Sequence, residues 1–255
     1  FPVDKIEYLV AHPVVSSHAC WSFAWPQELG VSPDTGETRC YILPKVENAM
    51  DIEGLYFSAH WLPDWFKYRV ARNYVGAVLD LHRAGCFVGD MPNAMIEKSG
   101  RCTLIDIDSL QISRDGAQFN CGVAKEETIA PELIPLIGDG GGTEFETTVH
   151  HDEWGTAVVI FRLLLGNHPF AFRYLGSHHR PQRIELVEKG IWPYAATCHP
   201  DYAPRRGATP LNVLDPELRL LFTRTFVSGH SSPNKRSTLE DWNLALTRLV
   251  KEGAS

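Results

Sequence analysis

The chain has 255 residues with a formal net charge of −7, and 44% of its residues are hydrophobic. This length can bury one large core or two modest ones, and the composition is ordinary for a globular protein. The acidic balance argues against a general nucleic-acid-binding surface, which requires basic residues to displace counterions. Apolar stretches fall short of the roughly 20 residues that a membrane-spanning helix needs. We therefore expect neither a nucleic-acid partner nor a membrane span.

The cysteines are scattered along the chain and form no CxxC pair. There are six of them: Cys20, Cys40, Cys86, Cys102, Cys121 and Cys198. Their spacing matches neither a disulfide-dense scaffold nor a zinc site. We interpret them as small, largely buried thiols of a protein in the reducing cytoplasm.

Hydrophobic spacing and turn residues predict a mixed first half of the chain. In chain order we expect a helix, two strands, a long helix and two further strands, at residues 4–12, 21–25, 40–46, 65–84, 94–97 and 103–107. The first two strands are expected to be joined by the Pro-Asp-Thr-Gly turn at 33–36. The last two are expected to form a hairpin around the turn 98–100.

The second half begins with a turn-rich stretch over residues 113–151, which includes a glycine run at 138–142 that we interpret as a flexible insertion. Helices dominate from there, at 153–165, 181–188, 216–227 and 239–251. The apolar run 157–165 fits a core helix.

Three polar residues follow the long helix at informative positions. Asp90 and Asn93 come after the glycine that ends this helix, and Asp106 ends the next hairpin. Phosphoryl transfer needs such groups close together, because one carboxylate accepts the proton of the attacking hydroxyl. An amide and a second carboxylate can hold Mg²⁺ against the nucleotide phosphates.

In these residues the chain resembles the protein-kinase superfamily, over roughly residues 4–250. Asp90 stands where the catalytic aspartate would be, in Val-Gly-Asp instead of His-Arg-Asp. Asn93 matches the metal-binding asparagine, and Asp106 matches the first residue of Asp-Phe-Gly, here Asp-Ile-Asp. The resemblance implies ATP as phosphoryl donor and Mg²⁺ as cofactor.

Further elements of the family pattern follow in the expected order. Glu132 ends an Ala-Pro-Glu motif, and Arg236 lies where kinases place the arginine that pairs with this glutamate. Asp152 begins an Asp-x-Trp helix and would tie down the backbone of the catalytic loop. The hinge that binds adenine through its backbone would lie at 41–46, with the candidates Tyr41, Ile42, Leu43 and Lys45.

The chain departs from the family pattern in three places. The catalytic loop of the family runs from Asp to Asn in a step of five, whereas Asp90 to Asn93 is a step of three that also removes the usual lysine. The printed sequence lacks a glycine-rich loop and its lysine-bearing strand, and the glycine run at 138–142 cannot replace them because it follows Ala-Pro-Glu. Asp108 replaces the glycine of Asp-Phe-Gly, either as a second metal ligand or as a turn residue that caps local N–H groups.

The resemblance implies an α+β, protein-kinase-like fold. Residues 1–46 would be a remnant of the N-terminal lobe with helix, strands and hinge, and residues 47–255 the mostly helical C-terminal lobe with catalytic loop and activation segment. The sequence thus resembles the larger lobe together with an incomplete β lobe.

Three functions are compatible with these features. The first is ATP- and Mg²⁺-dependent phosphoryl transfer to Ser or Thr hydroxyls of a protein substrate. The second is a pseudokinase, a scaffold or binding module with little turnover, which the short catalytic loop favours. The third is a small-molecule kinase of related fold. The Ile-Asp-x-Asp-Ser motif also resembles that of a divergent bacterial branch of kinase-like proteins. This resemblance implies a phosphatase or a von Willebrand A-type protein as partner.

Overall fold

A computed structural model describes residues 2–136, 146–177 and 179–253. The helices are α1 (Val3–Ala11), α2 (Ile52–Ser58), α3 (Asp64–Arg83), α4 (Val149–Leu165), α5 (Arg183–Lys189), α6 (Pro216–Thr223) and α7 (Leu239–Glu252). The strands are β1 (Trp21–Phe23), β2 (Glu28–Val31), β3 (Thr38–Ile42), β4 (Ala49–Asp51), β5 (Cys86–Phe87), β6 (Ala94–Glu97), β7 (Cys102–Leu104), β8 (Gln111–Arg114), β9 (Ala117–Phe119), β10 (Phe172–Tyr174) and β11 (Tyr202–Pro204).

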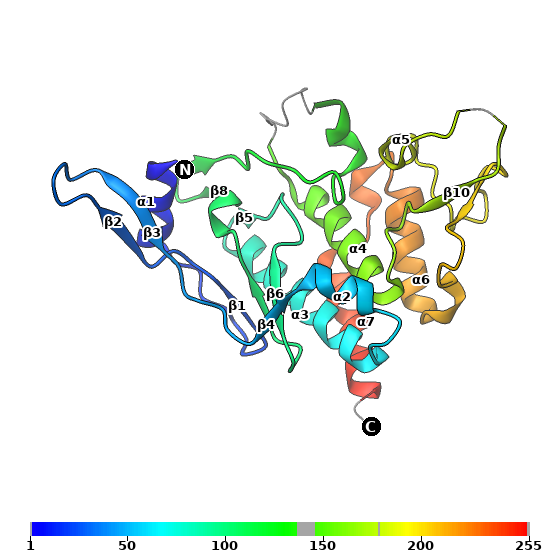
Figure 1. Cartoon of the computed structure of the whole chain (residues 1–255), viewed down its shortest axis with the longest axis horizontal. Helices are drawn as coiled ribbons and strands as arrows, with labels where there is room; N and C mark the ends of the chain where they lie inside the picture. Colours follow the sequence, from blue (N-terminus) through cyan, green and yellow to red (C-terminus); the bar gives the residue numbers. More distant parts are fainter. Residues whose placement is uncertain (1, 137–145, 178, 254–255) are drawn as a thin grey trace.

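The β2–β3 hairpin lies far from most of the helices. Figure 1 shows α1 and the β2–β3 hairpin at one end, and α4 to α7 gathered at the other. The predicted α+β class is confirmed, and the arrangement is compatible with a protein-kinase-like fold.

The central sheet joins segments from both sides of the long helix α3. Its strand order is β1-β7-β6-β4, with β1 parallel to β7 and β4 antiparallel to β6. The β6–β7 hairpin therefore lies in the middle of the sheet, with a strand from before α3 on each edge. This matters for function because β6 follows Asn93 directly and β7 leads to Asp106.

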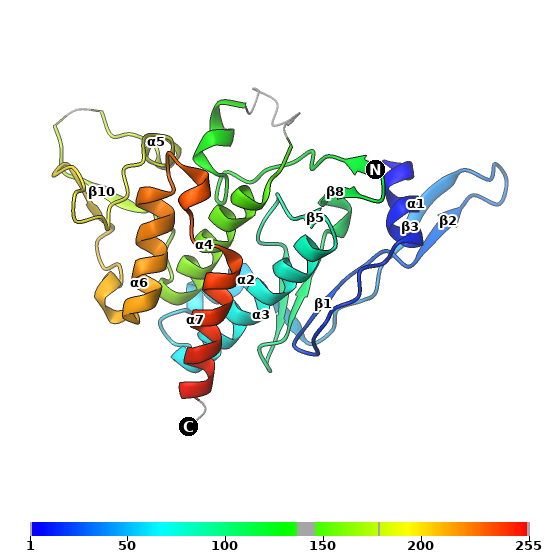
Figure 2. The ribbon, with the colours of Figure 1, turned by 180° about the vertical axis from the view of Figure 1, so that it is seen from behind.

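Helix α4 is the core helix that the apolar run predicted. Its residues from Asp152 to Leu165 are buried with the exception of Arg162. An all-round apolar helix must be enclosed by other elements, and here α2, α3 and the 224–228 segment contact it. Helix α7 packs along α3, and Figure 2 shows it on the face of the molecule that is turned away from the viewer in Figure 1.

Several boundaries differ from the predictions. The turn at 33–36 joins β2 to β3, whereas the prediction had it joining strands at 21–25 and 40–46. Strand β2 was not predicted, because it is exposed and its sequence lacks a clear hydrophobic alternation. The β8–β9 hairpin lies in the stretch predicted to be turn-rich, and α2 was not predicted. Both are short elements, which periodicity detects poorly.

Other predictions stand as follows. The helices predicted at 4–12, 65–84 and 239–251 are present as α1, α3 and α7. All six cysteines are free thiols, and five of them are buried or partly buried as predicted, whereas Cys40 in the exposed strand β3 is exposed. None of the helices in the described ranges combines the length and apolar character needed to cross a membrane. The glycine run at 138–142 lies outside the described residues.

Candidate active site

The loop at residues 88–93 is anchored by the buried carboxylate of Asp152 in α4. The backbone N–H groups of Val88 and Gly89 donate to its two oxygens at 2.7 and 2.8 Å. The ring of His82, near the end of α3, lies 2.7 Å from the same carboxylate. Because Asp152 is only 1% exposed, these hydrogen bonds are shielded from water and hold the loop firmly against α4.

Gly89 explains part of the departure from His-Arg-Asp. Its φ is +64°, a conformation in which side chains are strained. A Cβ at this position would lie 2.8 Å from the sulfur of Cys121. The backbone thus requires glycine directly before Asp90.

Asp90 and Asn93 are neighbours despite the short step between them. The amide of Asn93 donates to the backbone oxygen of Asp90 at 2.8 Å and to its Oδ2 at 3.1 Å. The chain is continuous here, so the short step is a property of this loop. The other carboxylate oxygen of Asp90, Oδ1, is shielded from solvent and has no hydrogen-bond partner among the described residues.

Asp106 is brought to Asn93 by the central sheet. The N–H of Ile105 donates to the backbone oxygen of Asn93 at 2.9 Å. Burial raises the pKa of Asp106, and the negative charges of Asp108 and Asp90 raise it further, against the opposing effect of Lys125. The charge of Asp90 thus contributes to the environment of Asp106. The predicted joint role of these two carboxylates in catalysis stays a prediction.

Asp108 contacts the end of β3. It lies in the 3₁₀ turn Ile107–Ser109 directly after Asp106. Burial raises the pKa of Tyr41 to about 12, helped by the charge of Asp108 and a hydrogen bond to it. Tyr41 was predicted to bind adenine through its backbone. The sequence did not indicate that its hydroxyl would reach the acidic corner formed by Asp90, Asp106 and Asp108.

Lys125 enters the acidic group from the segment 120–129, and the sequence analysis missed it. Its ammonium donates to Oδ1 of Asn93 and lies 3.9 Å from Oδ2 of Asp90. In the sequence this lysine precedes two glutamates, a pattern that indicates a solvated turn. Only the fold of the segment shows that its side chain points to Asn93.

Glu132 and Arg236 form a bidentate ion pair in which the arginine is buried and the glutamate partly buried. The two guanidinium nitrogens donate to the two carboxylate oxygens at 2.8 and 2.7 Å. The Arg236 side chain is 0% exposed. Burial would raise the pKa of Glu132, but the hydrogen bonds and charge of Arg236 outweigh it and lower this pKa. The pair joins the 3₁₀ segment Pro131–Leu136 to the chain just before α7.

The remaining hinge candidates lie where β3 ends and the chain crosses to β4. The backbone oxygen of Ile42 accepts from the N–H of Gln27 at 2.9 Å. Ile42 and Leu43 are partly exposed, and Lys45 forms an exposed ion pair with Glu47 at 2.8 Å. Adenine binding by this backbone stays a prediction.

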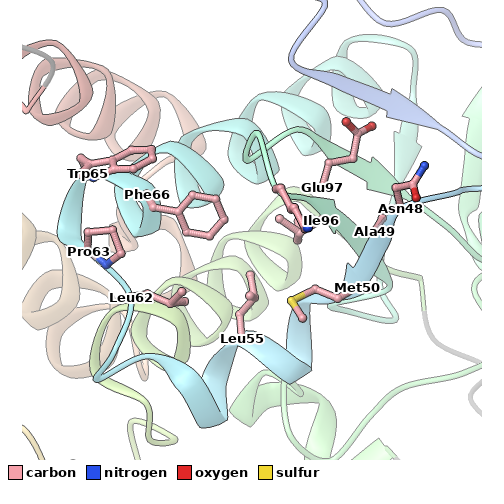
Figure 3. A pocket seen from close by; sticks show the side chains of 11 residues that line it. Asn48, Ala49, Met50, Leu55, Leu62, Pro63, Trp65, Phe66, Ile96 and Glu97 are labelled. Atoms are coloured by element: carbon pink, nitrogen blue, oxygen red, sulfur yellow. The ribbon is translucent and has the colours of Figure 1, made fainter.

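A hydrophobic pocket of about 760 Å³ lies elsewhere. Figure 3 shows Met50 of β4, Leu55 of α2 and Phe66 of α3 pointing into it, together with Leu62 from the connection between the two helices. Its lining includes none of the residues predicted for catalysis, metal binding or adenine binding. We therefore place the candidate active site at Asp90 and Asp106, outside this pocket.

The oxygen donors around Asn93 fit a magnesium ion that is also bound by phosphate. Within the described residues no group of three or more His, Cys, Asp or Glu side chains is arranged to hold a metal. Mg²⁺ in nucleotide sites commonly uses one or two carboxylates and the substrate phosphates. Asp106 and the amide oxygen of Asn93 are oxygen donors of this kind, so the sequence-based prediction of a magnesium site is chemically reasonable here.

The chain is similar to curated proteins described as protein kinases. Protein kinase YegI of Escherichia coli O157:H7 and that of Escherichia coli strain K12 are each 28% identical to it over 259 residues. The match covers 98% of this chain but 39% of each relative, so the chain spans about two fifths of their length. No family model matches it. The similarity supports a kinase-like relationship.

Proposed function

We propose that the chain carries the catalytic and peptide-binding part of a protein-kinase-like phosphotransferase. It transfers the γ-phosphoryl group of ATP to a Ser or Thr hydroxyl of a protein substrate. The observation that carries this proposal is the contact of Asn93 with Asp90 and, through the backbone of Ile105, with the segment that leads to Asp106, on a loop held by the buried carboxylate of Asp152.

Asp90 is the proposed general base. Its carboxylate accepts the proton of the substrate hydroxyl. The hydroxyl oxygen then forms a bond to the γ-phosphorus as the bond to the β–γ bridging oxygen breaks, and ADP leaves. Magnesium, when bound, neutralises charge on the phosphate oxygens. Asn93 and Asp106 are the residues proposed to hold it, with Asp108 as a further carboxylate beside them.

The other proposed roles concern positioning. The backbone of residues 41–46, with Tyr41, Ile42, Leu43 and Lys45, binds adenine, and the chain divides there into an N-terminal remnant and a helical lobe. The Glu132–Arg236 pair keeps the activation segment in one conformation, because both groups are largely withdrawn from solvent. A fixed shelf of this kind favours a protein substrate over a small molecule. The further partner we propose is a phosphatase or a von Willebrand A-type protein.

A pseudokinase is the second candidate function. The amide oxygen of Asn93, which a metal would need, already accepts a hydrogen bond from Lys125. A protein that binds nucleotide weakly and uses its surface as a scaffold would tolerate this contact.

The test is phosphate transfer from labelled ATP by the protein expressed from its complete gene. We expect Mg²⁺-dependent incorporation that Asp90→Asn lowers by about 100-fold or more, because a positioned general base contributes about that much. Asp115→Asn is the matched control, because it removes the same charge from an exposed turn outside the site. Undiminished transfer by Asp90→Asn would refute the assignment of the base. Failure of the unchanged protein to bind ATP would favour the scaffold.

A further inference from the structure

The acidic corner of the site contains a cation that the family pattern does not supply. Asp90 and Asp106 are the proposed reacting carboxylates there, and the ammonium of Lys125 lies 3.9 Å from Oδ2 of Asp90. Lys125 comes from the segment between β9 and Ala130-Pro131-Glu132, not from the 88–93 loop. Because its charge lies beside the proposed general base, Lys125 can influence the reacting groups directly.

The position of the Lys125 ammonium is defined on two sides. It donates to Oδ1 of Asn93, a residue only 9% exposed, and lies 3.9 Å from Oδ2 of Asp90. An ammonium has three donors, so the contact with Asn93 leaves two for other acceptors. The side chain keeps 40% of its surface exposed, which is the accessibility that contact with a substrate requires.

The backbone that carries Lys125 is held against the same loop. The N–H groups of Thr128 and Ile129 both donate to the backbone oxygen of Lys125 at 3.0 Å. The hydroxyl of Thr128 donates to the backbone oxygen of Met91 at 3.1 Å. Met91 directly follows Asp90, so the segment and the 88–93 loop form one unit. Lys125 is therefore presented by a fixed turn and does not depend on a flexible loop for its location.

We propose that Lys125 is a phosphate-binding catalytic residue of this site. It provides, from the activation segment, the cationic contact to the transferred phosphoryl group that the short 88–93 loop lacks. This inference rests on the proposed function. A phosphoryl group that passes to a hydroxyl at Asp90 must lie between Asp90 and the metal-binding residues, which is where the Lys125 ammonium is. Negative charge on the phosphoryl oxygens is stabilised there by a preorganised cation.

The proposal separates Lys125 from a lysine that only supports the fold. A structural ion pair would affect stability and would change the affinity for ADP and for ATP alike. A contact to the terminal phosphate changes the affinity for the triphosphate alone. Since Oδ1 of Asn93 has two lone pairs, it can accept from Lys125 and still face a metal.

The experiment measures equilibrium binding of ADP and of a non-hydrolysable ATP analogue, both with Mg²⁺, by calorimetry. We expect Lys125→Met to weaken binding of the ATP analogue by about tenfold and to change ADP binding by less than about twofold. Lys125→Arg keeps the charge and should retain most of the preference for the triphosphate. Lys98→Met, at an exposed turn of the β6–β7 hairpin, is the matched control and should bind both nucleotides like the unchanged protein.

The outcomes distinguish the two proposals. If the unchanged protein binds neither nucleotide, the proposed function fails and this inference fails with it. If it binds both and Lys125→Met leaves their affinity ratio unchanged, this inference alone is overturned. Tighter binding of the ATP analogue by Lys125→Met also overturns it, because the ammonium would then be occupying the place of the metal. Thermal unfolding of each variant checks that it is folded.

Discussion

Arg236 shows at the scale of one residue how distant segments are joined. Besides Glu132, its guanidinium donates to the backbone oxygens of His150 and Gly229, at 2.8 and 3.0 Å. It also lies over the ring of Trp154, 5.0 Å from the centroid. Arg236 thereby donates hydrogen bonds to two carbonyl groups and a partly buried carboxylate from three separate segments.

We expect Arg236→Ala to lower the free energy of unfolding by about 3–5 kcal/mol, because it leaves the partly buried carboxylate of Glu132 without its counter-charge. Urea denaturation measures the change. Arg248→Ala is the control: Arg248 pairs with Asp215 and Glu217, but its side chain is 40% exposed. A similar loss in both variants would contradict the importance given to burial.

Helix α3 shows the same dependence on context at the scale of an element. Its Gly76 faces Trp21 of β1, and a Cβ at this position would lie 2.7 Å from the indole ring. The ring cannot easily move, because its N–H donates to Oδ2 of Asp80 at 2.7 Å and Trp21 is 7% exposed. Glycine in the middle of this long helix therefore allows β1 to pack on it.

The two helical glycines of α3 and α2 should respond oppositely to alanine. We expect Gly76→Ala to destabilise the protein by about 1–3 kcal/mol through overpacking. Gly54→Ala in α2 should be neutral or stabilise it by up to about 1 kcal/mol, because no atom lies within 4 Å of the added Cβ. Chemical denaturation of both variants checks this, and equal effects would contradict the packing of β1 on α3.

Acid sensitivity is a property of the whole molecule, and His168 contributes to it. Its Nε2 lies 2.8 Å from the backbone oxygen of Glu127, and its Nδ1 accepts from the N–H of Phe170 at 3.1 Å. Burial, helped by the positive charge of Arg183, lowers its pKa to about 3. A proton on Nδ1 would remove the hydrogen bond to Phe170, so the folded state keeps this ring neutral.

The sign of the effect follows from linkage. Above pH of about 6.5 His168 is neutral in both states. Below that value the unfolded chain takes up the proton first, so stability falls as the pH decreases towards about 3. Glu132, with its lowered pKa, acts in the same direction below about 4.5. Asp106 and Glu153, whose pKa values are raised mainly by burial, act in the opposite direction.

Because these groups oppose one another, the test compares two proteins. Denaturation midpoints of the unchanged protein and of His168→Gln are measured between about pH 7.5 and 4.5. We expect the unchanged protein to lose stability more steeply, by up to about 1.4 kcal/mol per pH unit. Parallel curves would mean that His168 is not buried as a neutral ring.

The long helices and the order of the motifs could be predicted from the sequence, because both depend on local information. Helix α3 has apolar residues at helical spacing over twenty positions, and α7 begins with a Thr238–Asp241 capping box. Short strands could not be located as well. Three or four residues carry little periodicity, and the pairing of β1 with β7 is supplied by a partner far along the chain.

The sequence by itself determined the α+β class and the residue types available for chemistry: Asp90, Asn93 and Asp106 in their order. Tertiary structure alone decided which other side chains join them. Lys125 and Tyr41 reach the acidic corner from separate segments. The physical reason is that a long polar side chain has no periodic signature, and its electrostatic partners are selected only when folding excludes water and brings opposite charges together.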